Sequence, residues 1–301
     1  MPHASPRLSQ RLMWRIEALA YDSVSLLTAL LPFGALSRFG GWVLSLIGPM
    51  SSKHHIARTN IKIAFPDLSD DEAKQLLKDQ WVSCGRTLAE FPALHRLKAF
   101  DPNSRISVDG LEKLKAQNPA VIVTGHFANW EIMALVMTQA GLPVQITYRK
   151  INNPHIDARV RKKREAYGTK LLVQKSGIKG ARQLIEAMDN GESVALLNDQ
   201  KFNEGLSLPL FSKDAMTATG AVRLALKTKR PLIPISLRRD GAKFHMTVHD
   251  AIKLNDGGVR SENIKAGVIQ VNKFIEKTIT AQPQDWFWVH RRWPKPLYKD
   301  N

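Results

Sequence analysis

The stretch Ala120-Val-Ile-Val-Thr-Gly-His-Phe-Ala-Asn-Trp-Glu131 decides the fold. Residues 121–124 are uncharged and β-branched, and they follow an Asn-Pro break, which together predict a buried strand. Gly125 ends this strand, and the apolar run that follows Glu131 predicts a helix. We therefore expect His126 in a strand-to-helix turn, with Glu131 in the first turn of the helix.

This spacing suggests a pair of side chains that act on a proton. The Glu131 carboxylate can fold back under the imidazole of His126, hold one ring N–H and stabilise the imidazolium. The other ring nitrogen then stays free to accept a proton from a substrate hydroxyl. A single His-x4-Glu is common by chance, however, and Asn129 or Glu131 could simply cap the helix. The pair alone is a weak indication of catalysis.

Composition restricts the partners. The 301 residues are 44% hydrophobic, which is enough for a sizeable core, and the formal net charge is +17. Such an excess indicates an anionic partner: nucleic acid, anionic lipid or an acidic carrier protein. The single cysteine, Cys84, excludes an intrachain disulfide and a cysteine-based zinc site, and we expect it to be a small buried hydrophobic residue.

The centre of the chain alternates strands and helices. The predicted strands are 105–108, 121–124, 144–148, 171–173, 193–198, 232–236 and 244–249. The predicted helices are 68–97, which opens with a Ser69/Glu72 capping box, and then 111–117, 131–140, 154–167, 180–188 and 219–228. This alternation predicts an α/β fold, a mostly parallel central sheet flanked by helices. Sites in such sheets gather at the carboxyl ends of strands, where His126, Arg149 and Asp199 fall.

The N-terminal region predicts a membrane anchor. Residues 23–37 and 39–50 are uncharged, but each is shorter than the roughly 20 apolar residues of a full span. Together they would form a kinked span or a shallow hairpin, giving an anchor region 1–52 ahead of a catalytic domain 53–301. Basic residues flank both sides, so charge chooses no orientation. The alternative is a pair of buried helices in a soluble domain.

Four ordered motifs point to one family. Gly125-His126-x-x-Asn129-Trp130-Glu131 resembles the first motif of the bacterial lipid A biosynthesis acyltransferases, the late lauroyl and myristoyl transferases of lipopolysaccharide synthesis, at every fixed position. The stretches 148–157, 198–219 and 284–293 resemble the other three motifs. Lys150 stands where proline is frequent and Ser212 where glycine is usual. The resemblance extends over about residues 10–296.

This resemblance implies a glycerolipid-acyltransferase-like fold with an N-terminal helical anchor at the cell inner membrane and an active site on the cytoplasmic side. It also implies acyl carrier protein as the donor and a hydroxyl of a Kdo-bearing, bis-phosphorylated lipid A precursor as the acceptor. Both are acidic, which suits the charge of +17. No cofactor is expected beyond the acyl carrier protein co-substrate. The chain has no zinc-type histidine spacing and no phosphate-loop motif, so no metal is expected either.

The expected catalytic residues are His126 as general base and Glu131 as its orienting carboxylate. The expected substrate-binding residues, all in the motifs or on the helix that follows the second motif, are Asn129, Arg149, Asn153, Arg164, Asp199 and Gln200. Arg149 could grip a phosphate or stabilise an oxyanion, and Arg164 is expected to grip a phosphate of the acceptor. Because no serine or cysteine nucleophile motif is present, we expect direct transfer without an acyl-enzyme.

Two alternatives remain open on sequence alone. The same site could acylate another membrane lipid, such as a lysophospholipid or an ornithine or inositol lipid. Outside enzymes, the chain could be a basic peripheral membrane or nucleic-acid-binding protein, although its basic residues form no known nucleic-acid module, so no nucleic-acid partner is expected. The sequence does not fix the acyl length, the acceptor position or the order of the step.

Overall fold

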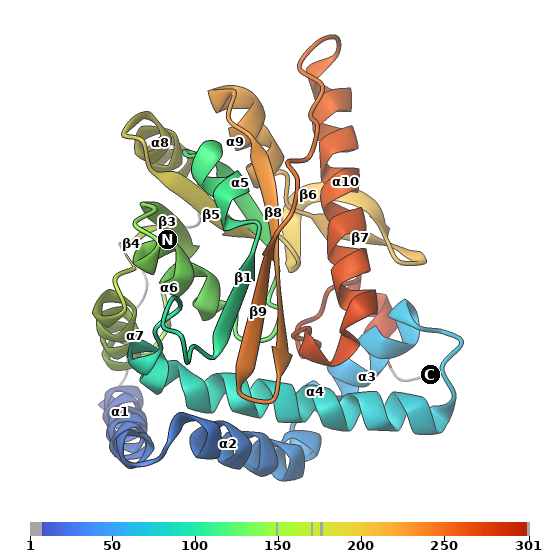
Figure 1. Cartoon of the computed structure of the whole chain (residues 1–301). Helices are drawn as coiled ribbons and strands as arrows, with labels where there is room; N and C mark the ends of the chain where they lie inside the picture. Colours follow the sequence, from blue (N-terminus) through green and yellow to red (C-terminus); the bar gives the residue numbers. More distant parts are fainter. Residues whose placement is uncertain (1–7, 149, 170, 175–176, 300–301) are drawn as a thin grey trace.

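The computed structural model describes residues 8–148, 150–169, 171–174 and 177–299 (Figure 1). A seven-stranded sheet forms its centre, in the order β1-β9-β8-β2-β5-β3-β4. Its strands are β1 (Ile106–Asp109), β2 (Val121–Thr124), β3 (Val144–Tyr148), β4 (Leu171–Gln174), β5 (Ser193–Leu197), β8 (Leu232–Asp240) and β9 (Lys243–Val248). Every pairing is parallel except that of β8 with β9. The predicted α/β class with a mostly parallel sheet is therefore confirmed.

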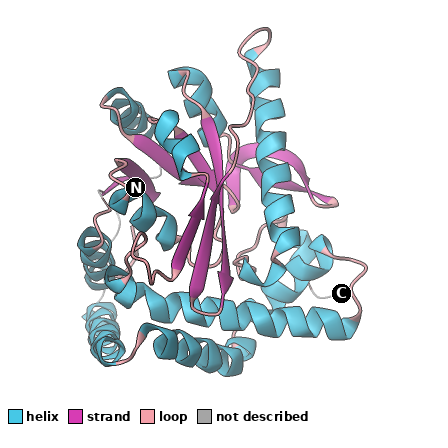
Figure 2. Cartoon of the chain, in the orientation of Figure 1, coloured by secondary structure: helices cyan, strands magenta, loops and turns pink. Residues whose placement is uncertain are grey.

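Helices surround this sheet (Figure 2). They are α1 (Leu8–Leu30), α2 (Phe33–Ile47), α3 (Lys53–Ala64), α4 (Asp70–Glu90), α5 (Leu111–Ala116), α6 (Glu131–Gln139), α7 (Pro154–Ala166), α8 (Gly177–Asp189), α9 (Gly220–Thr228) and α10 (Arg260–Ala281). In Figure 1, α4 runs across the lower end of the sheet, and α1 and α2 lie below it. The sequence did not predict α3, α10 or the hairpin of β6 (Lys201–Leu210) and β7 (Lys213–Thr217) beside α10.

The short strand β2 lies between β8 and β5, so both of its edges are paired. All four of its residues are buried, which explains why the strand carries no charge. Thr124 at its end pairs with Leu197 at the end of β5. The residues that follow these two strands therefore share one edge of the sheet, as predicted for His126 and Asp199. Arg149 lies outside the described residues.

The N-terminal helices differ from the expected arrangement. The two uncharged runs do not correspond to two helices, because α2 runs through Arg38 and the chain bends at Pro32, which fixes the entry to α2. Helix α2 packs closely on α4, where Gly40 meets Gly85: a Cβ built on Gly40 would lie 2.5 Å from the carbonyl oxygen of Gly85. Within the described part of the chain, no helix has both the length and the apolar character needed to cross a bilayer. The boundary between anchor and domain at residue 52 stays a prediction.

Two smaller expectations are confirmed. Ser69 and Glu72 form the predicted capping box at the start of α4, with the Ser69 side chain accepting from the Glu72 backbone N–H. Cys84 is buried on the same helix, and burial raises the pKa of its thiol to about 12.

Candidate active site

His126 is held by Asp199 from the neighbouring strand. Its Nδ1 lies 2.8 Å from Oδ1 of Asp199, and its backbone N–H donates to Oδ2 at 2.9 Å. Since a carboxylate only accepts, Nδ1 carries a hydrogen in this contact, and Nε2 of the neutral ring is left as the acceptor. Nε2 lies 3.4 Å from the side-chain nitrogen of Gln200. The ring is therefore fixed in the tautomer that a general base requires.

Asp199 is itself almost fully enclosed, with 1% of its side chain exposed. The indole N–H of Trp286 donates to its Oδ2 at 2.8 Å. Burial alone would raise the pKa of Asp199, but the charge and hydrogen bonds of His126, together with the bond from Trp286, outweigh burial and lower this pKa below its usual range. Asp199 is thus an ionised partner for the imidazole, and the substrate-binding role expected from the sequence stays a prediction.

The predicted contact between Glu131 and His126 is wrong. The Glu131 carboxylate instead accepts two hydrogen bonds from Arg164, from Nε at 3.0 Å and from Nη2 at 2.5 Å, and a third from the hydroxyl of Tyr167 at 2.5 Å. Glu131 begins α6 and points toward α7, which carries Arg164. The imidazole of His126 pairs instead with the carboxylate of Asp199, which follows β5 at the same edge of the sheet.

This pairing also corrects the role expected for Arg164. The planar edge of its guanidinium is occupied by Glu131, and only 17% of its side chain is exposed, so the edge is not free to grip a phosphate. Burial would lower the pKa of Arg164, but Glu131 raises it above its ordinary value. Burial and the nearby Glu131 charge likewise raise the pKa of Tyr167. The cluster is thus a mostly buried ion pair without net charge beside the site.

A cavity of about 260 Å³ opens next to these groups. Its polar lining includes His126, Glu131, Arg164 and Gln200, and apolar side chains form much of the rest. The apolar lining residues come from α6, the β3 region and β5: Met133, Ile146, Ile151, Ala195 and Leu197. The cavity therefore joins a hydrocarbon-lined space to the free face of the imidazole.

Aromatic rings form the walls around the imidazole. The ring centroid of Trp130 lies 4.9 Å from that of His126 in an edge-to-face arrangement, and Phe287 lies at 6.1 Å. Phe287 also donates its backbone N–H to the carbonyl oxygen of His126 at 3.1 Å. The last sequence motif thus packs directly on the first one and fixes the ring.

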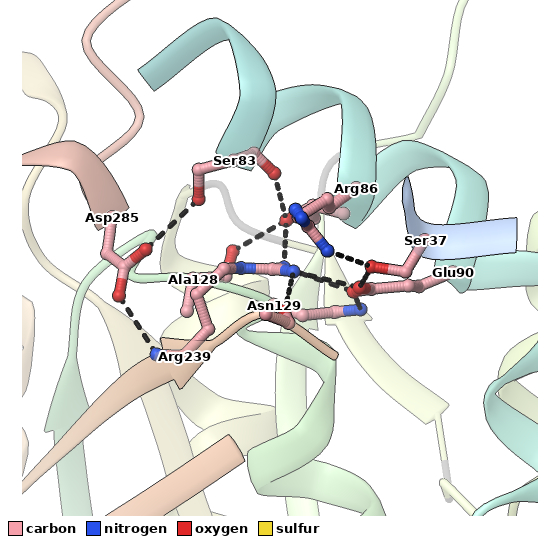
Figure 3. Close-up of polar contacts among 10 residues, drawn as sticks. Ser37, Ser83, Arg86, Glu90, Ala128, Asn129, Arg239 and Asp285 are labelled. Carbon is pink, nitrogen blue, oxygen red and sulfur yellow. Dashed lines mark hydrogen bonds and ion pairs between the residues drawn. The ribbon is translucent and has the colours of Figure 1, made fainter. Parts of the chain in front are cut away.

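Asn129 belongs to a buried polar network rather than to the cavity wall (Figure 3). Its side chain is fully buried, and its amide nitrogen donates to Glu90 at 3.0 Å. Glu90 also accepts from Ser37 and from two nitrogens of Arg239, at 2.8 and 3.0 Å. Asn129 therefore anchors the turn that carries His126, and its binding of substrate stays a prediction.

The polar network of Figure 3 also contacts the His126 turn at Ala128. Ala128 has a φ of 46°, a strained value for a residue with a Cβ. Its backbone N–H donates to the carbonyl oxygen of Asp285 at 2.7 Å, and its own carbonyl oxygen accepts from Thr87 at 2.9 Å. The Asp285 side chain accepts in turn from Ser83 and from the backbone of Arg239. These contacts hold the turn in an unfavourable conformation.

Asn153 has a structural position as well. Its side-chain oxygen caps α7 by accepting from the His155 backbone, and its nitrogen donates to Glu17 at 2.7 Å and to the carbonyl oxygen of Trp14. It is buried and ties α7 to α1, and its binding of substrate stays a prediction. Of the predicted substrate-binding residues, Gln200 and Arg164 line the cavity.

Sequence reasoning missed Tyr167, Trp286, Glu90, Arg239 and Asp285. The signal for Trp286 was present, since it lies in the fourth motif, but tryptophans there were equally consistent with core packing. Tyr167 and Arg239 lie outside all four motifs. Glu90 lies on a helix whose sequence is typical of a solvated surface.

Comparison with known proteins identifies the family. The profile of the bacterial lipid A biosynthesis acyltransferases matches residues 2–295. The chain belongs to this family. It is therefore an O-acyltransferase, which removes the non-enzymatic alternatives.

Individual relatives agree with this assignment. The acyltransferase is 28% identical over 278 residues to the lipid A biosynthesis palmitoleoyltransferase of Escherichia coli (strain K12), covering 87% of this chain and 86% of the relative. It is 27% identical over 283 residues to the lipid A biosynthesis lauroyltransferase of the same organism, with the same coverage. A lipid A biosynthesis acyltransferase of Haemophilus influenzae is 25% identical over 285 residues, covering 87% and 85%.

Among solved structures, the 1-acyl-sn-glycerophosphate acyltransferase of Thermotoga maritima aligns with 80% of this chain and 97% of its own. The TM-score is 0.38 and the identity 13%, a similarity too low to bear on function.

Proposed function

We propose that this acyltransferase moves a fatty acyl chain from an acyl carrier protein thioester to a hydroxyl of a Kdo-bearing lipid A precursor, at the cytoplasmic side of the inner membrane. The observation that carries the proposal is the imidazole of His126, fixed by Asp199 at 2.8 Å, beside a cavity with a largely apolar lining. Transfer of an acyl chain to a hydroxyl requires a base that accepts the hydroxyl proton, and a hydrophobic site next to that base that holds the acyl chain.

The chemical step follows from the tautomer. Nε2 of His126 takes the proton of the acceptor hydroxyl as the oxygen attacks the thioester carbonyl. Asp199 stabilises the imidazolium that forms, and the tetrahedral intermediate then collapses with loss of the thiolate. The imidazolium returns its proton to the leaving sulfur, so the enzyme ends the cycle unchanged. No acyl-enzyme is needed.

Glu131 acts through Arg164 in this proposal. The carboxylate fixes the guanidinium at the cavity wall, and the mostly buried Glu131–Arg164 pair forms an oriented dipole. There it favours negative charge that develops on the thioester oxygen. Glu131 is therefore a positioning residue rather than the partner of the base.

The apolar lining of the cavity accommodates the acyl chain. Ala195 and Leu197 extend from β5, and Met133 faces them from α6. Burial of each methylene group contributes about 0.8 kcal/mol, so a chain of ordinary length gains enough to be held while its thioester reacts. The apolar side chains that line the cavity then determine which chain lengths fit.

Membrane placement is supported by exposed apolar residues on the first two helices. Phe39 and Trp42 on α2 are 56% and 59% exposed, and Leu8, Leu12, Leu19 and Leu26 on α1 are also exposed. A helix with such a face lies in a membrane interface without crossing the bilayer. The net charge of +17 adds attraction to anionic lipid, to an acidic carrier protein and to a phosphorylated acceptor.

Mass spectrometry of lipid A tests the proposal in the cell. Cells that lack this protein should accumulate a lipid A species lacking one acyl chain. The wild-type gene should restore that chain, and the His126→Ala variant, produced at the same level, should not. Unchanged lipid A in the deletion strain, with a change in another lipid class, would refute the proposed acceptor.

A further inference from the structure

A second cavity, of about 420 Å³, lies between α2, α4, the start of β1 and the turn from β8 to β9. It shares no residue with the cavity at His126. Four cationic side chains line it, against one carboxylate, that of Asp240. They are Arg38, Arg86, Arg105 and Lys243. The proposed acyl transfer leaves this cavity without a role.

Most of this positive charge is not neutralised by the protein. Arg38, Arg105 and Lys243 form no ion pair within the described residues. Arg86 differs, because its guanidinium donates to Ser37 at 3.0 Å and lies close to the buried Glu90. Leaving Arg86 aside, three cations face one anion, so the cavity has a net charge of about +2.

The start of helix α2 adds to the positive electrostatic potential of the cavity. Pro32, Gly34 and Ala35 at the start of α2 line the cavity. The first backbone N–H groups of a helix have no intrahelical acceptor, and no side chain caps α2. The helix dipole places further positive charge at this end. Guanidinium groups and free backbone N–H groups are the donors that bind phosphate in proteins.

The surroundings indicate where that phosphate comes from. Phe39, the residue after Arg38, and Trp42 one turn further along α2 are both more than half exposed. Exposed aromatic residues beside basic ones are typical of a membrane interface, where the rings lie at the level of the lipid headgroups. The cavity therefore lies beside α2, whose exposed apolar residues we place in the membrane interface.

We propose that this cavity binds the phosphate of an anionic phospholipid headgroup and so seats the enzyme on the membrane. The inference rests on the proposed placement of α1 and α2 at the membrane surface. The headgroup enters between Arg38 and Arg105, and its phosphate accepts hydrogen bonds from these two side chains. Arg86 links this cavity to the network of Figure 3 through Ser37 and Glu90.

The test compares two variants that remove equal charge from the same side of the molecule. Arg38→Gln/Arg105→Gln empties the cavity of two cations, whereas Arg11→Gln/Arg15→Gln removes two exposed cations from α1. Binding is measured by co-sedimentation with phosphatidylcholine vesicles and with vesicles that contain phosphatidylglycerol. Circular dichroism confirms that both variants are folded.

The cavity variant should lose roughly thirtyfold in affinity for phosphatidylglycerol vesicles, because it lacks two basic residues and each one near an anionic surface contributes about 1 kcal/mol. The α1 variant should lose clearly less, and binding to neutral vesicles should be equal in all three proteins. Equal losses in the two variants would mean diffuse attraction and would overturn the headgroup site. Failure of the wild type to bind any vesicle would instead refute the membrane placement on which the inference rests.

A soluble probe separates the headgroup from free phosphate. Short-chain phosphatidylglycerol below its micellar concentration should raise the melting temperature of the wild type and of the α1 variant, but not that of the cavity variant. The same shift with inorganic phosphate alone would overturn the lipid assignment and indicate a free-anion site.

Discussion

Asp199 approaches His126 twice, through the ring Nδ1 at 2.8 Å and through the backbone N–H at 2.9 Å, although 73 positions separate the two residues. The double contact fixes both the ring and the turn from which it extends. Register in the sheet is the cause, because β2 and β5 are parallel neighbours that end at the same level. The following predictions depend on this arrangement and on the separate pairing of Glu131 with Arg164.

Breaking the Glu131–Arg164 pair should destabilise the fold. Glu131→Leu leaves Arg164 without its carboxylate in a mostly buried position, and removing one partner of a buried ion pair typically costs about 3–5 kcal/mol. The double variant Glu131→Leu/Arg164→Met removes both charges and should recover most of that loss. Urea unfolding of the two variants measures the difference. A double variant as unstable as the single one would show that the pair is not the source of the effect.

Filling the apolar cavity should shorten the preferred acyl chain. Ala195→Leu adds three carbons to a buried wall, so the longest chain accepted should shrink by about that many carbons. Leu197→Met, which keeps the side-chain volume nearly constant, serves as the control and should leave the preference unchanged. Competition among thioesters of different length, read by mass spectrometry of the product, measures both. An unchanged preference in the Ala195 variant would place the acyl chain elsewhere.

Acid should remove a stabilising contribution from Asp199. Its pKa in the folded protein is lowered, so the folded state binds this proton less readily than the unfolded state does. The contribution is therefore fully present above the unfolded pKa of about 3.9, and it is lost as the pH falls from there toward the folded pKa. The free energy of unfolding of the wild type, minus that of Asp199→Asn, should decrease as the pH falls below about 4. A difference independent of pH down to 3 would contradict the ionised pairing.

The sheet could be predicted from the sequence because its signals are local. The runs at 121–124 and 144–148 match the observed strands, and alternation with helices was enough to infer parallel pairing. The hairpin at 201–217 was missed, although buried Leu208 and Leu210 alternate with exposed Ser207 and Pro209 in its first strand, because a proline in the run and the polar stretch before it weaken the strand signal.

Only part of the active site could be predicted, because side-chain directions are not encoded in local sequence signals as strands are. The sequence placed His126 and Asp199 at one sheet edge, but it assigned the imidazole to Glu131 because their spacing was short. Spacing along the chain does not tell which way a side chain leaves a helix start, and Glu131 leaves toward α7. The Glu90–Arg239 contact spans 149 positions and joins α4 to β8, so no local pattern could reveal it.

The central claim is that Asp199, and not Glu131, sets the state of the catalytic imidazole. Its most direct test is the kcat of purified Asp199→Asn at neutral pH, with acyl carrier protein thioester as donor and a Kdo-bearing lipid A precursor as acceptor. An asparagine whose amide faces Nδ1 would donate to it, favour the tautomer with hydrogen on Nε2 and remove the base, which should lower kcat by about 10²–10⁴-fold with little change in KM. A kcat within a few-fold of the wild type would contradict the account.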